Sequence, residues 1–435
     1  TSADIIKLAM VRLDEKVFNK MVERRRDFHR YPETGWAEFR TTSKIAETLI
    51  NAGMDIRFAG DFVEMEYVLG RNADIEAQVT RAVSQGASPE NIEKMKGLTG
   101  LTAEIDTGSP GPVTAIRFDI DCVDTTETGG SSHLPRQLGF NSVNPNCMHA
   151  CAHDGHTAIG MTLAEKLFSE KSSLKGKVRF IFQPAEEGAR GGYAFVKSGA
   201  VDDADYFLTL HLGLGNPTGT VFGGTDGFLY STKIDADYRG VGAHAGAEPQ
   251  KGKNALLAAA SAALSIHGIA PSPDGLTRTN VGVLNAGDGR NVVPPKAHMK
   301  IETRGATEDA AIYIYRAVMR ILHGAAEMYD VKLTTQKCGE AISATSDREL
   351  AKIVMEAASS VCGVDRTDLI QPMAGSDDAC WMMKKVRDNG GKATYIGIGA
   401  DTKAGHHNDH FDFDEKAMLI AFGVLYKTVF VLNGK

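Results

Sequence analysis

The stretch that decides the fold runs Gly176-Lys177-Val178-Arg179-Phe180-Ile181-Phe182-Gln183-Pro184-Ala185-Glu186-Glu187. Its first half is rich in β-branched and aromatic residues over the length of one buried strand. The run stops at a proline and continues with two adjacent carboxylates. In α/β sheets, functional groups gather just beyond the C-terminal ends of the strands. We therefore expect Glu186 and Glu187 to lie at such an end.

The flanking sequence repeats this pattern. Residues 113–121 contain a second short β run that ends in two aspartates, and residues 206–211 contain a third that ends in a histidine. Helices are predicted between these strands at 156–169 and 191–198. Alternating strands and helices predict an α/β domain with a mixed central sheet flanked by helices. The same pattern resumes near the C-terminus, with a helix at 347–360, a strand at 394–398 and a last helix from residue 414.

Residues 229–339 have a different order of elements. It is the β-α-β-β-α-β order of the ferredoxin-like fold. The expected strands are 232–240, 278–285, 292–303 and 331–337, and the expected helices are 254–268 and 307–329. We therefore predict a main domain made of residues 1–228 and 340–435, interrupted by a smaller domain at 229–339.

Ahead of the first strands, the chain is helical. Residues 5–30 predict a charged amphipathic helix that ends before Pro32, and residues 41–53 predict a second one. Residues 72–96 are polar and helix-favouring, which is typical of a surface insertion. Within it, Ser88-Pro89-Glu90 is a capping sequence for a short helix.

Composition narrows the class of protein. The chain has 435 residues, of which 43% are hydrophobic and 24% charged, as in soluble globular proteins. Its net charge of −7 argues against nucleic acid as a partner, because such proteins carry a basic face. We find no uninterrupted apolar stretch near 18 residues and expect no membrane span. Residues 1–4 lack the basic and apolar regions of a signal peptide.

The cysteines indicate a reducing compartment. Six cysteines in a chain of this length are too few for a disulfide scaffold, so we expect free thiols and a cytoplasmic location. Most of them should be small buried hydrophobic residues. Cys151 is the expected exception because of its neighbours.

Potential metal ligands gather in four places. The segment Met148-His149-Ala150-Cys151-Ala152-His153-Asp154-Gly155-His156 carries three histidines, a thiol and a carboxylate. The other three places are Glu186-Glu187, His211 and His406-His407. Two ions that share ligands need about five to seven donors, which this set supplies.

The two adjacent glutamates suit a division of labour. One carboxylate can bind metal while its neighbour moves a proton as a general base. On its own, a Glu-Glu pair would be interpreted as solvated charge on a helix. Its position after a buried strand, together with the other three clusters, favours the catalytic interpretation.

Other motifs give weaker evidence of function. The glycines at 213, 215 and 219 lack the dinucleotide-binding spacing and open no helix. Cys147 and Cys151 lack the CxxC spacing of a redox pair. No GxSxG motif is present, so covalent catalysis has no candidate except Cys151.

Taken together, the motifs resemble the dinuclear metallo-amidohydrolase and metallopeptidase family that includes carboxypeptidase G, hippurate hydrolase and plant auxin-amide hydrolases. Within that family, the chain resembles in particular the A subunit of aminobenzoyl-glutamate hydrolase and bacterial indole-3-acetyl-aspartate hydrolase, which share the insertion after residue 70. The resemblance covers nearly the whole chain. The motifs that carry it are Arg24-Arg25-xxx-His29-xx-Pro32-Glu33, Asp119-Ile120-Asp121, the 148–157 cluster, Glu186-Glu187, Gly242-Ala243-His244-Ala245, Asn291-Val292-Val293-Pro294, Gly375-Ser376-Asp377-Asp378 and the segment 407–414.

The resemblance implies a role for each matching residue. It implies that Glu186 is the base and that His244 of a second subunit holds the carbonyl oxygen. Asn291, Arg304 and the Gly375 backbone would line the substrate end, where Arg304 is suited to hold a carboxylate with two hydrogen bonds. The implied metal ligands are Cys151, His153, Glu187, His211 and His407.

The resemblance also implies cofactors and partners. It implies two divalent ions per subunit, with manganese as first choice. Zinc is the alternative, because thiolate and imidazole ligands favour it. It further implies a homodimer formed through residues 229–339, which would act as a lid, or an assembly that includes a sister subunit.

Two positions depart from the family pattern. Ala152 replaces a glycine, and if this position requires a positive φ, the alanine is strained by roughly 1 kcal/mol. Asp377 replaces a glutamate. Neither change removes an expected ligand.

The expected function is hydrolysis of the amide bond of an N-aroyl or N-arylacetyl amino acid, such as 4-aminobenzoyl-glutamate or indole-3-acetyl-aspartate. One alternative is a dipeptidase or carboxypeptidase that acts on ordinary peptides. Another is a non-catalytic subunit of a hetero-oligomeric hydrolase. Retention of Glu186 and of all five expected ligands argues against the last one.

Overall fold

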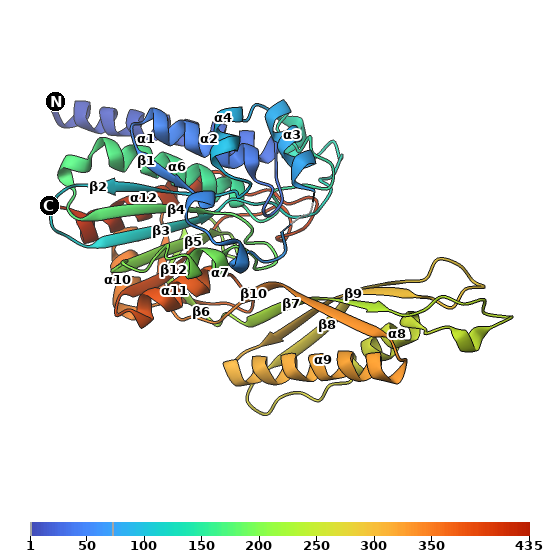
Figure 1. Cartoon of the computed structure of the whole chain (residues 1–435). Helices are drawn as coiled ribbons and strands as arrows, with labels where there is room; N and C mark the ends of the chain where they lie inside the picture. Colours follow the sequence, from blue (N-terminus) through green and yellow to red (C-terminus); the bar gives the residue numbers. More distant parts are fainter. Residues whose placement is uncertain (1, 72–73) are drawn as a thin grey trace.

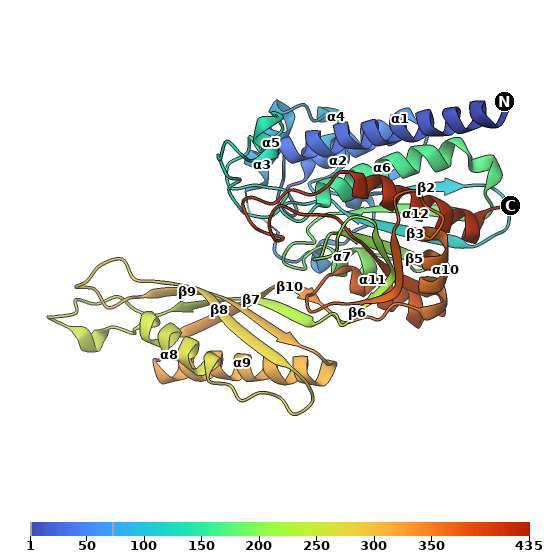
Figure 2. The ribbon, with the colours of Figure 1, turned by 180° about the vertical axis from the view of Figure 1, so that it is seen from behind.

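The computed structural model describes the backbone of residues 2–71 and 74–435 (Figure 1). Its strands form two sheets, one of eight strands and one of four. The four-stranded sheet extends away from the larger body, as the two opposite views in Figures 1 and 2 show. Both chain ends lie on the larger body.

The larger sheet is mixed, as predicted. Its strand order is β1-β2-β4-β3-β5-β12-β6-β11. The central strands β4, β3, β5 and β12 run parallel. The pairings of β1 with β2, of β2 with β4 and of β12 with β6 are antiparallel. The strands are β1 (Asp55–Phe58), β2 (Leu101–Asp106), β3 (Val113–Asp119), β4 (Lys177–Gln183), β5 (Tyr206–Leu212), β6 (Thr220–Asp226), β11 (Arg366–Pro372) and β12 (Lys392–Ile398).

Helices cover both faces of this sheet. Successive side chains of a strand point to opposite faces, so Phe180 and Phe182 of β4 join one hydrophobic cluster and Ile181 joins another. The first cluster is covered by α1 (Ser2–Arg30), α2 (Phe39–Asn51), α6 (His153–Ser169), α10 (Arg348–Ala358) and α12 (Lys416–Asn433). The second is covered by α7 (Gly192–Lys197) and α11 (Ala379–Asp388).

The smaller sheet has the predicted ferredoxin-like order of elements. Its strand order is β10-β7-β9-β8 and all three pairings are antiparallel. Side chains such as Ile234 and Ile301 pack under two helices, while Lys233 and Glu302 point to the open face. The elements are β7 (Tyr230–Arg239), α8 (Ala255–His267), β8 (Thr277–Ala286), β9 (Lys296–Gly305), α9 (Glu308–Met328) and β10 (Lys332–Ala341).

The predicted insertion is helical. It forms α3 (Ile75–Ser84) and α4 (Pro89–Lys94), which lie beside α2. Ser88 Oγ accepts a hydrogen bond from the Asn91 amide, which confirms the predicted cap. Residues 72 and 73, where the predicted insertion begins, lie outside the described residues. One more short helix, α5 (Leu134–Gln137), follows β3.

Six helices and strands of the larger body were not predicted from the sequence. They are β1, β2, α5, β6, β11 and α11. β6 carries Gly223 and Gly224, which weaken a strand pattern, and their lack of side chains admits Ala351 and Ser346 instead. β11 is an edge strand whose residues are mostly only partly buried, so it has no continuous apolar run.

One apolar helix bears on the expectation that no segment spans a membrane. Within residues 2–71 and 74–435, one helix, α12, is long and apolar enough to span a membrane, with a mean hydropathy of 1.4 over 18 residues. In the structure 61% of it is buried, and it packs against α6 and α10. A helix that is apolar all round is also what a core position requires, and α12 occupies such a position.

Candidate metal centre and catalytic cleft

The four predicted ligand clusters meet at one edge of the larger sheet. Glu186 and Glu187 follow β4, His211 is the second-last residue of β5, and the histidine pair at 406–407 lies in the loop after β12. Cys151 and His153 lie at the start of α6. Because β4, β5 and β12 are parallel, their C-terminal ends share one edge, which is why residues distant in sequence converge.

Distances within the cluster are short. Cys151 Sγ lies 3.5 Å from His211 Nε2. His407 Nε2 lies 3.2 Å from Glu187 Oε1, and His153 Nε2 lies 4.0 Å from the same oxygen. Candidate ligand atoms of Cys151, His153 and Glu187 all lie within 4.8 Å of one another. The structure thus brings all five expected ligands together.

The histidines are oriented by their second ring nitrogens. His211 Nδ1 bonds to the Leu212 carbonyl oxygen at 2.8 Å, which leaves Nε2 facing Cys151. His153 Nδ1 contacts the Asp121 carbonyl oxygen at 2.9 Å, and its buried Nε2 has no hydrogen-bond partner among the described residues. A buried nitrogen without a partner costs free energy unless a further group satisfies it. Imidazoles held in this way are typical metal ligands, so the donor set fits metal ions.

His406 also reaches the cluster, although the sequence favoured its neighbour as the ligand. Its ring centroid lies 5.3 Å from that of His211, and its Nδ1 has no partner among the described residues. Its Nε2 already accepts a hydrogen bond from the Leu214 amide. His407 Nε2 contacts the carboxylate of Glu187. The structure therefore places His407 beside Glu187, whereas candidate ligand atoms of His406, Cys151 and His211 lie within 4.8 Å of one another.

Asp121 fixes the turn that carries the two glutamates. Its carboxylate accepts the amide hydrogens of Glu186 at 3.1 Å and Glu187 at 2.9 Å. The same carboxylate lies 3.3 Å from His153 Nδ1. One buried aspartate therefore positions both the expected base and two expected ligands. The motif that contains Asp121 was visible in the sequence, but this role was not.

Glu186 lies in a setting that suits proton transfer. Burial, together with Asp377 and Glu187, raises the pKa of Glu186 well above its usual range. Its carboxylate lies 3.8 Å from His153 Nε2. A carboxylate whose pKa is raised accepts a proton more readily than an ordinary glutamate, which suits a group that takes a proton and later gives it up.

A buried arginine organises the acidic residues behind the cleft. Arg117 contacts Asp119 at 2.8 Å, Asp378 at 2.9 Å and Gln183 at 2.9 Å. Asp377 accepts a hydrogen bond from the Tyr395 hydroxyl. This network was not predicted, because a lone Arg within a strand carries no motif; its one signal was a charge inside an otherwise apolar run.

The start of α6 is held by the N-terminal helix. Asp154 accepts hydrogen bonds from Arg25 at 2.9 Å and His29 at 2.8 Å. Burial opposes the charge on His29, but its bonds to Asp154 and Glu127 raise its pKa to about 9. The Arg25 and His29 positions of the N-terminal motif are thus supports for α6, and α6 carries His153.

The cluster opens into a cleft of about 400 Å³, which we name the inner cleft. Arg304 lines it, as do Met373 and Ser376 on either side of Gly375. The Gly375 carbonyl oxygen accepts the Leu229 amide at 2.8 Å. The other residues that line the inner cleft include Cys151, Glu186, Glu187, His211, Lys233, Glu302, Asp377, His406 and His407.

His244 and Asn291 do not line this cleft. They lie together in loops of the smaller sheet, where Ala245 donates its amide hydrogen to the Asn291 carbonyl oxygen. His244 is exposed, and its Nδ1 accepts the amide hydrogens of Gly246 and Ala247. Within one chain, these two residues are therefore not part of the metal cluster.

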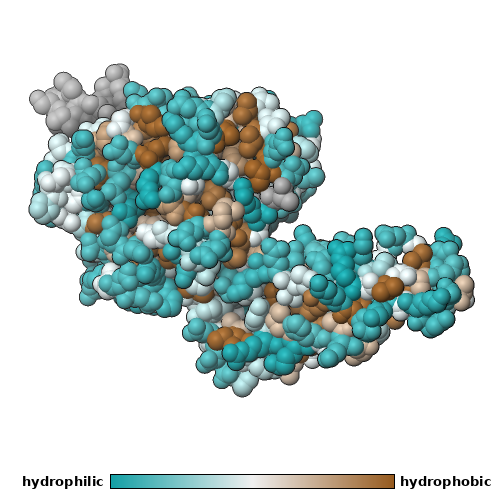
Figure 3. Space-filling view, in the orientation of Figure 1, coloured by the Kyte–Doolittle hydropathy of each residue, from teal (hydrophilic) through white to brown (hydrophobic). Residues whose placement is uncertain are grey.

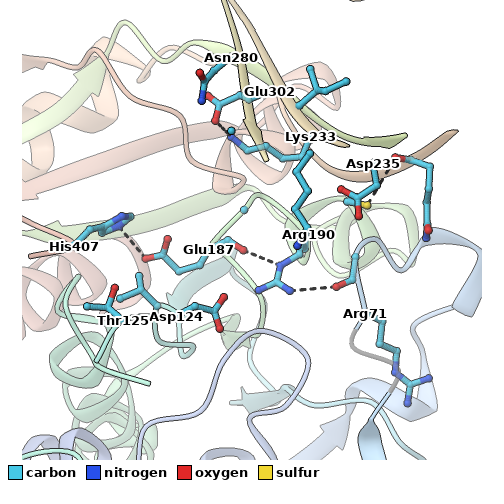
Figure 4. Close-up of a pocket in the computed structure, with 18 residues that line it drawn as sticks. Arg71, Asp124, Thr125, Glu187, Arg190, Lys233, Asp235, Asn280, Glu302 and His407 are labelled. Carbon is cyan, nitrogen blue, oxygen red and sulfur yellow. Dashed lines mark hydrogen bonds and ion pairs between the residues drawn. The ribbon is translucent and has the colours of Figure 1, made fainter. Parts of the chain in front are cut away.

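A larger cleft of about 660 Å³, the outer cleft, adjoins the inner one (Figure 4). Glu187 and His407 line both clefts, as do Lys233 and Glu302 from the smaller sheet. Figure 4 shows Arg190 beneath Glu187 and Arg71 farther out. A parallel-strand edge that gathers a thiol, histidines and carboxylates in a cleft defines a metallohydrolase.

Comparison with known proteins supports this class of protein. Residues 115–430 match the model of peptidase family M20/M25/M40. The indole-3-acetyl-aspartic acid hydrolase of Enterobacter agglomerans is 46% identical over 413 residues, which cover 94% of this chain and 95% of that protein. The A subunit of the p-aminobenzoyl-glutamate hydrolase of Escherichia coli is 44% identical with the same coverage. The crystal structure of the aminobenzoyl-glutamate utilization protein from Klebsiella pneumoniae matches with a TM-score of 0.83 at 37% identity, covering 96% of this chain and 97% of that one.

The chain therefore belongs to peptidase family M20/M25/M40. It is a metal-dependent hydrolase of amide bonds. The fold alone is also shared with a dinuclear metal-binding peptidase of Bacillus subtilis, at a TM-score of 0.65 and 23% identity.

Proposed function

We propose that this chain hydrolyses the amide bond between an aroyl or arylacetyl group and an acidic amino acid. The observation that carries the proposal is the partly buried Glu186 beside the cluster of Cys151, His153 and Glu187 in one cleft. The names of the relatives support the substrate class, since they act on indole-3-acetyl-aspartic acid and p-aminobenzoyl-glutamate.

The ligand atoms of this site are suited to bind two divalent ions. Cys151, His153, Glu187, His211 and His407 would hold them, and the unpartnered His153 Nε2 supports this assignment. Bound there, the ions would polarise the substrate carbonyl and lower the pKa of water. We propose manganese first and zinc as the alternative, since a thiolate with imidazoles also suits zinc.

Proton movement falls to Glu186. Its carboxylate would take a proton from the attacking water and deliver it to the leaving nitrogen. The raised pKa of Glu186, caused by burial and its acidic neighbours, allows both steps.

His244 would donate to the carbonyl oxygen of a substrate bound in a partner subunit. Two backbone amides occupy its Nδ1, so Nε2 carries the proton and is free to donate. The side chain is exposed and lies outside the inner cleft of its own chain. This placement favours a site that is completed by a second subunit.

The smaller sheet supports a homodimer through residues 229–339, with this part acting as the lid. β8 is one of its two edge strands, and an edge strand offers unpaired backbone groups to another chain. Leu264 of α8 is also 79% exposed. A sister subunit is the second candidate partner, since the name of the Escherichia coli relative makes it one subunit of its hydrolase. We place the enzyme in the cytoplasm, in keeping with its six free cysteines.

The test is a substrate panel with the chain reloaded with manganese or zinc. It compares 4-aminobenzoyl-glutamate, indole-3-acetyl-aspartate and an unmodified dipeptide such as Ala-Glu. We expect cleavage of at least one aromatic conjugate at a kcat/KM well above that of the dipeptide. Preference for the dipeptide would contradict the proposal and favour a peptidase. Two bound metals without cleavage of any substrate would favour a missing partner subunit.

A further inference from the structure

The open face of the smaller sheet presents a compact group of charges to the inner cleft. Lys233 of β7 and Glu302 of β9 are directly opposite in the antiparallel register, and Arg304 follows on the same face. Lys233 Nζ lies 2.8 Å from Glu302 Oε2, and Arg304 Nε bonds to Glu302 Oε1. One carboxylate is thus shared between two cations, which leaves one positive charge in excess.

Lys233 and Arg304 bring positive charge to the inner cleft. Among the described lining residues, Lys233 and Arg304 are the lysine and arginine side chains that reach the inner cleft. The two side chains are only 24% and 32% exposed, so their charges are partly shielded from water. Burial lowers the pKa of Lys233, and Glu302 opposes that shift. Charge-assisted hydrogen bonds strengthen in such partly desolvated positions.

Lys233 also lies where the two clefts meet. It lines both the inner and the outer cleft, and Figure 4 shows it reaching from the smaller sheet on the side opposite Glu187 and His407. The negative charge of Glu186 also acts on Lys233 and raises the pKa of its ammonium group. A group bound to Lys233 therefore lies in the inner cleft, on the side that opens to the outer cleft.

We propose that Lys233 is the specificity-determining residue that binds the side-chain carboxylate of the substrate's acidic amino acid, while Arg304 binds its α-carboxylate. The inference rests on the proposed function. A dicarboxylic amino acid has two carboxylates that are a few bonds apart. Lys233 and Arg304 are likewise close to each other, because both bind the carboxylate of Glu302. A neutral side chain would leave the Lys233 ammonium without a substrate partner, which disfavours its binding.

The experiment compares 4-aminobenzoyl-L-glutamate with 4-aminobenzoyl-L-glutamine, which has the same shape without the charge. Wild-type enzyme should prefer the glutamate conjugate. In Lys233→Met, kcat/KM for the glutamate conjugate should fall by about 10- to 100-fold, the effect of one lost charge-assisted hydrogen bond. The value for the glutamine conjugate should stay nearly constant, so the preference disappears. Lys233→Arg should retain most of the preference.

Lys300→Met is the matched control, because Lys300 lies on β9 and lines the outer cleft but not the inner one. It removes the same charge and should leave the preference intact. Equal losses on both conjugates in Lys233→Met, or no preference in the wild type, would overturn the role of Lys233 while the proposed function stands. Cleavage of neither conjugate by the wild type would overturn the proposed function and this inference with it.

Discussion

At the residue scale, Ala152 occupies a backbone conformation that normally selects glycine. Its φ is 65°, so the positive φ considered from the sequence is confirmed. Such a residue persists where the surroundings determine the backbone, and here it is fully buried immediately before His153. His407, with φ of 67°, is a second non-glycine residue in this conformation at the site.

Replacing Ala152 by glycine should therefore cost little. Relief of about 1 kcal/mol of strain offsets the loss of a buried methyl group worth about 0.8 kcal/mol. Ala150 is equally buried but has no positive φ, so it is the matched control. Urea unfolding should show Ala150→Gly to be less stable than Ala152→Gly by about 1 kcal/mol. Equal losses would contradict the strain.

Asp121 gives a second prediction at this scale. In Asp121→Asn, one acceptor oxygen becomes a donor group that faces the Glu186 amide, the Glu187 amide or His153. We expect metal affinity and kcat/KM to fall by about 10- to 100-fold, as for other groups that orient ligands. Asp106→Asn, at the exposed end of β2, is the control. Unchanged metal affinity in Asp121→Asn would contradict this role.

At the element scale, the contact of α1 with α6 makes stability depend on pH. His29 has a pKa raised to about 9 through Asp154 and Glu127, against about 6.5 in the unfolded chain. A raised pKa stabilises the fold fully below pH 6.5, and this contribution is lost as pH rises through 9. The full contribution is on the order of 3 kcal/mol.

Thermal unfolding at several pH values checks this prediction. The melting temperature of the wild type should fall between pH 6.5 and pH 9.5, and His29→Gln should show a smaller fall. His323→Gln, which removes an exposed histidine of α9, should follow the wild type. Parallel curves for the wild type and His29→Gln would show that His29 does not cause the loss.

The elements also show what sequence can and cannot predict. β4 and β5 were predictable because apolar runs end abruptly in Glu186 or His211, and that punctuation also located the ligands. The smaller sheet was predictable because its strands and helices alternate in hydrophobic period. By contrast, β11 is partly exposed and β6 contains two glycines, so neither shows a strand pattern.

Side-chain partnerships across the sequence were beyond prediction. Arg117 and Asp378 are 261 residues apart, and Arg25 and Asp412 are 387 apart. Only the tertiary packing of the strands, helices and loops brings such residues together, and no local pattern encodes that packing. The orientations of the His406 and His407 rings were likewise beyond prediction, because spacing does not determine them.

At the scale of the whole molecule, the proposed dimer predicts complementation between inactive variants. Glu186→Gln and His244→Asn should each be inactive alone. If each site uses His244 of the partner subunit, a mixed dimer contains one site with both native residues. Mixing after subunit exchange should restore about one quarter of wild-type activity. No recovery, with exchange demonstrated, would place both residues in one subunit's site.

The smaller sheet and its helices expose several apolar residues. In Figure 3, the extended part shows hydrophobic residues scattered among hydrophilic ones on the visible face. Exposed apolar residues of this part include Val241, Leu257, Leu264 and Val292. Val292 lies opposite His244 in a β-bridge, so part of this apolar surface adjoins the histidine that the dimer would present.

The most direct test of the account is Glu186→Gln assayed on 4-aminobenzoyl-glutamate, with bound metal counted on the same sample. The central claim is that Glu186 moves the proton while its neighbours hold the metals. It predicts two metals per subunit in both proteins and a kcat at least about 10²-fold lower in the variant. Turnover near the wild-type rate with both metals bound would contradict the claim.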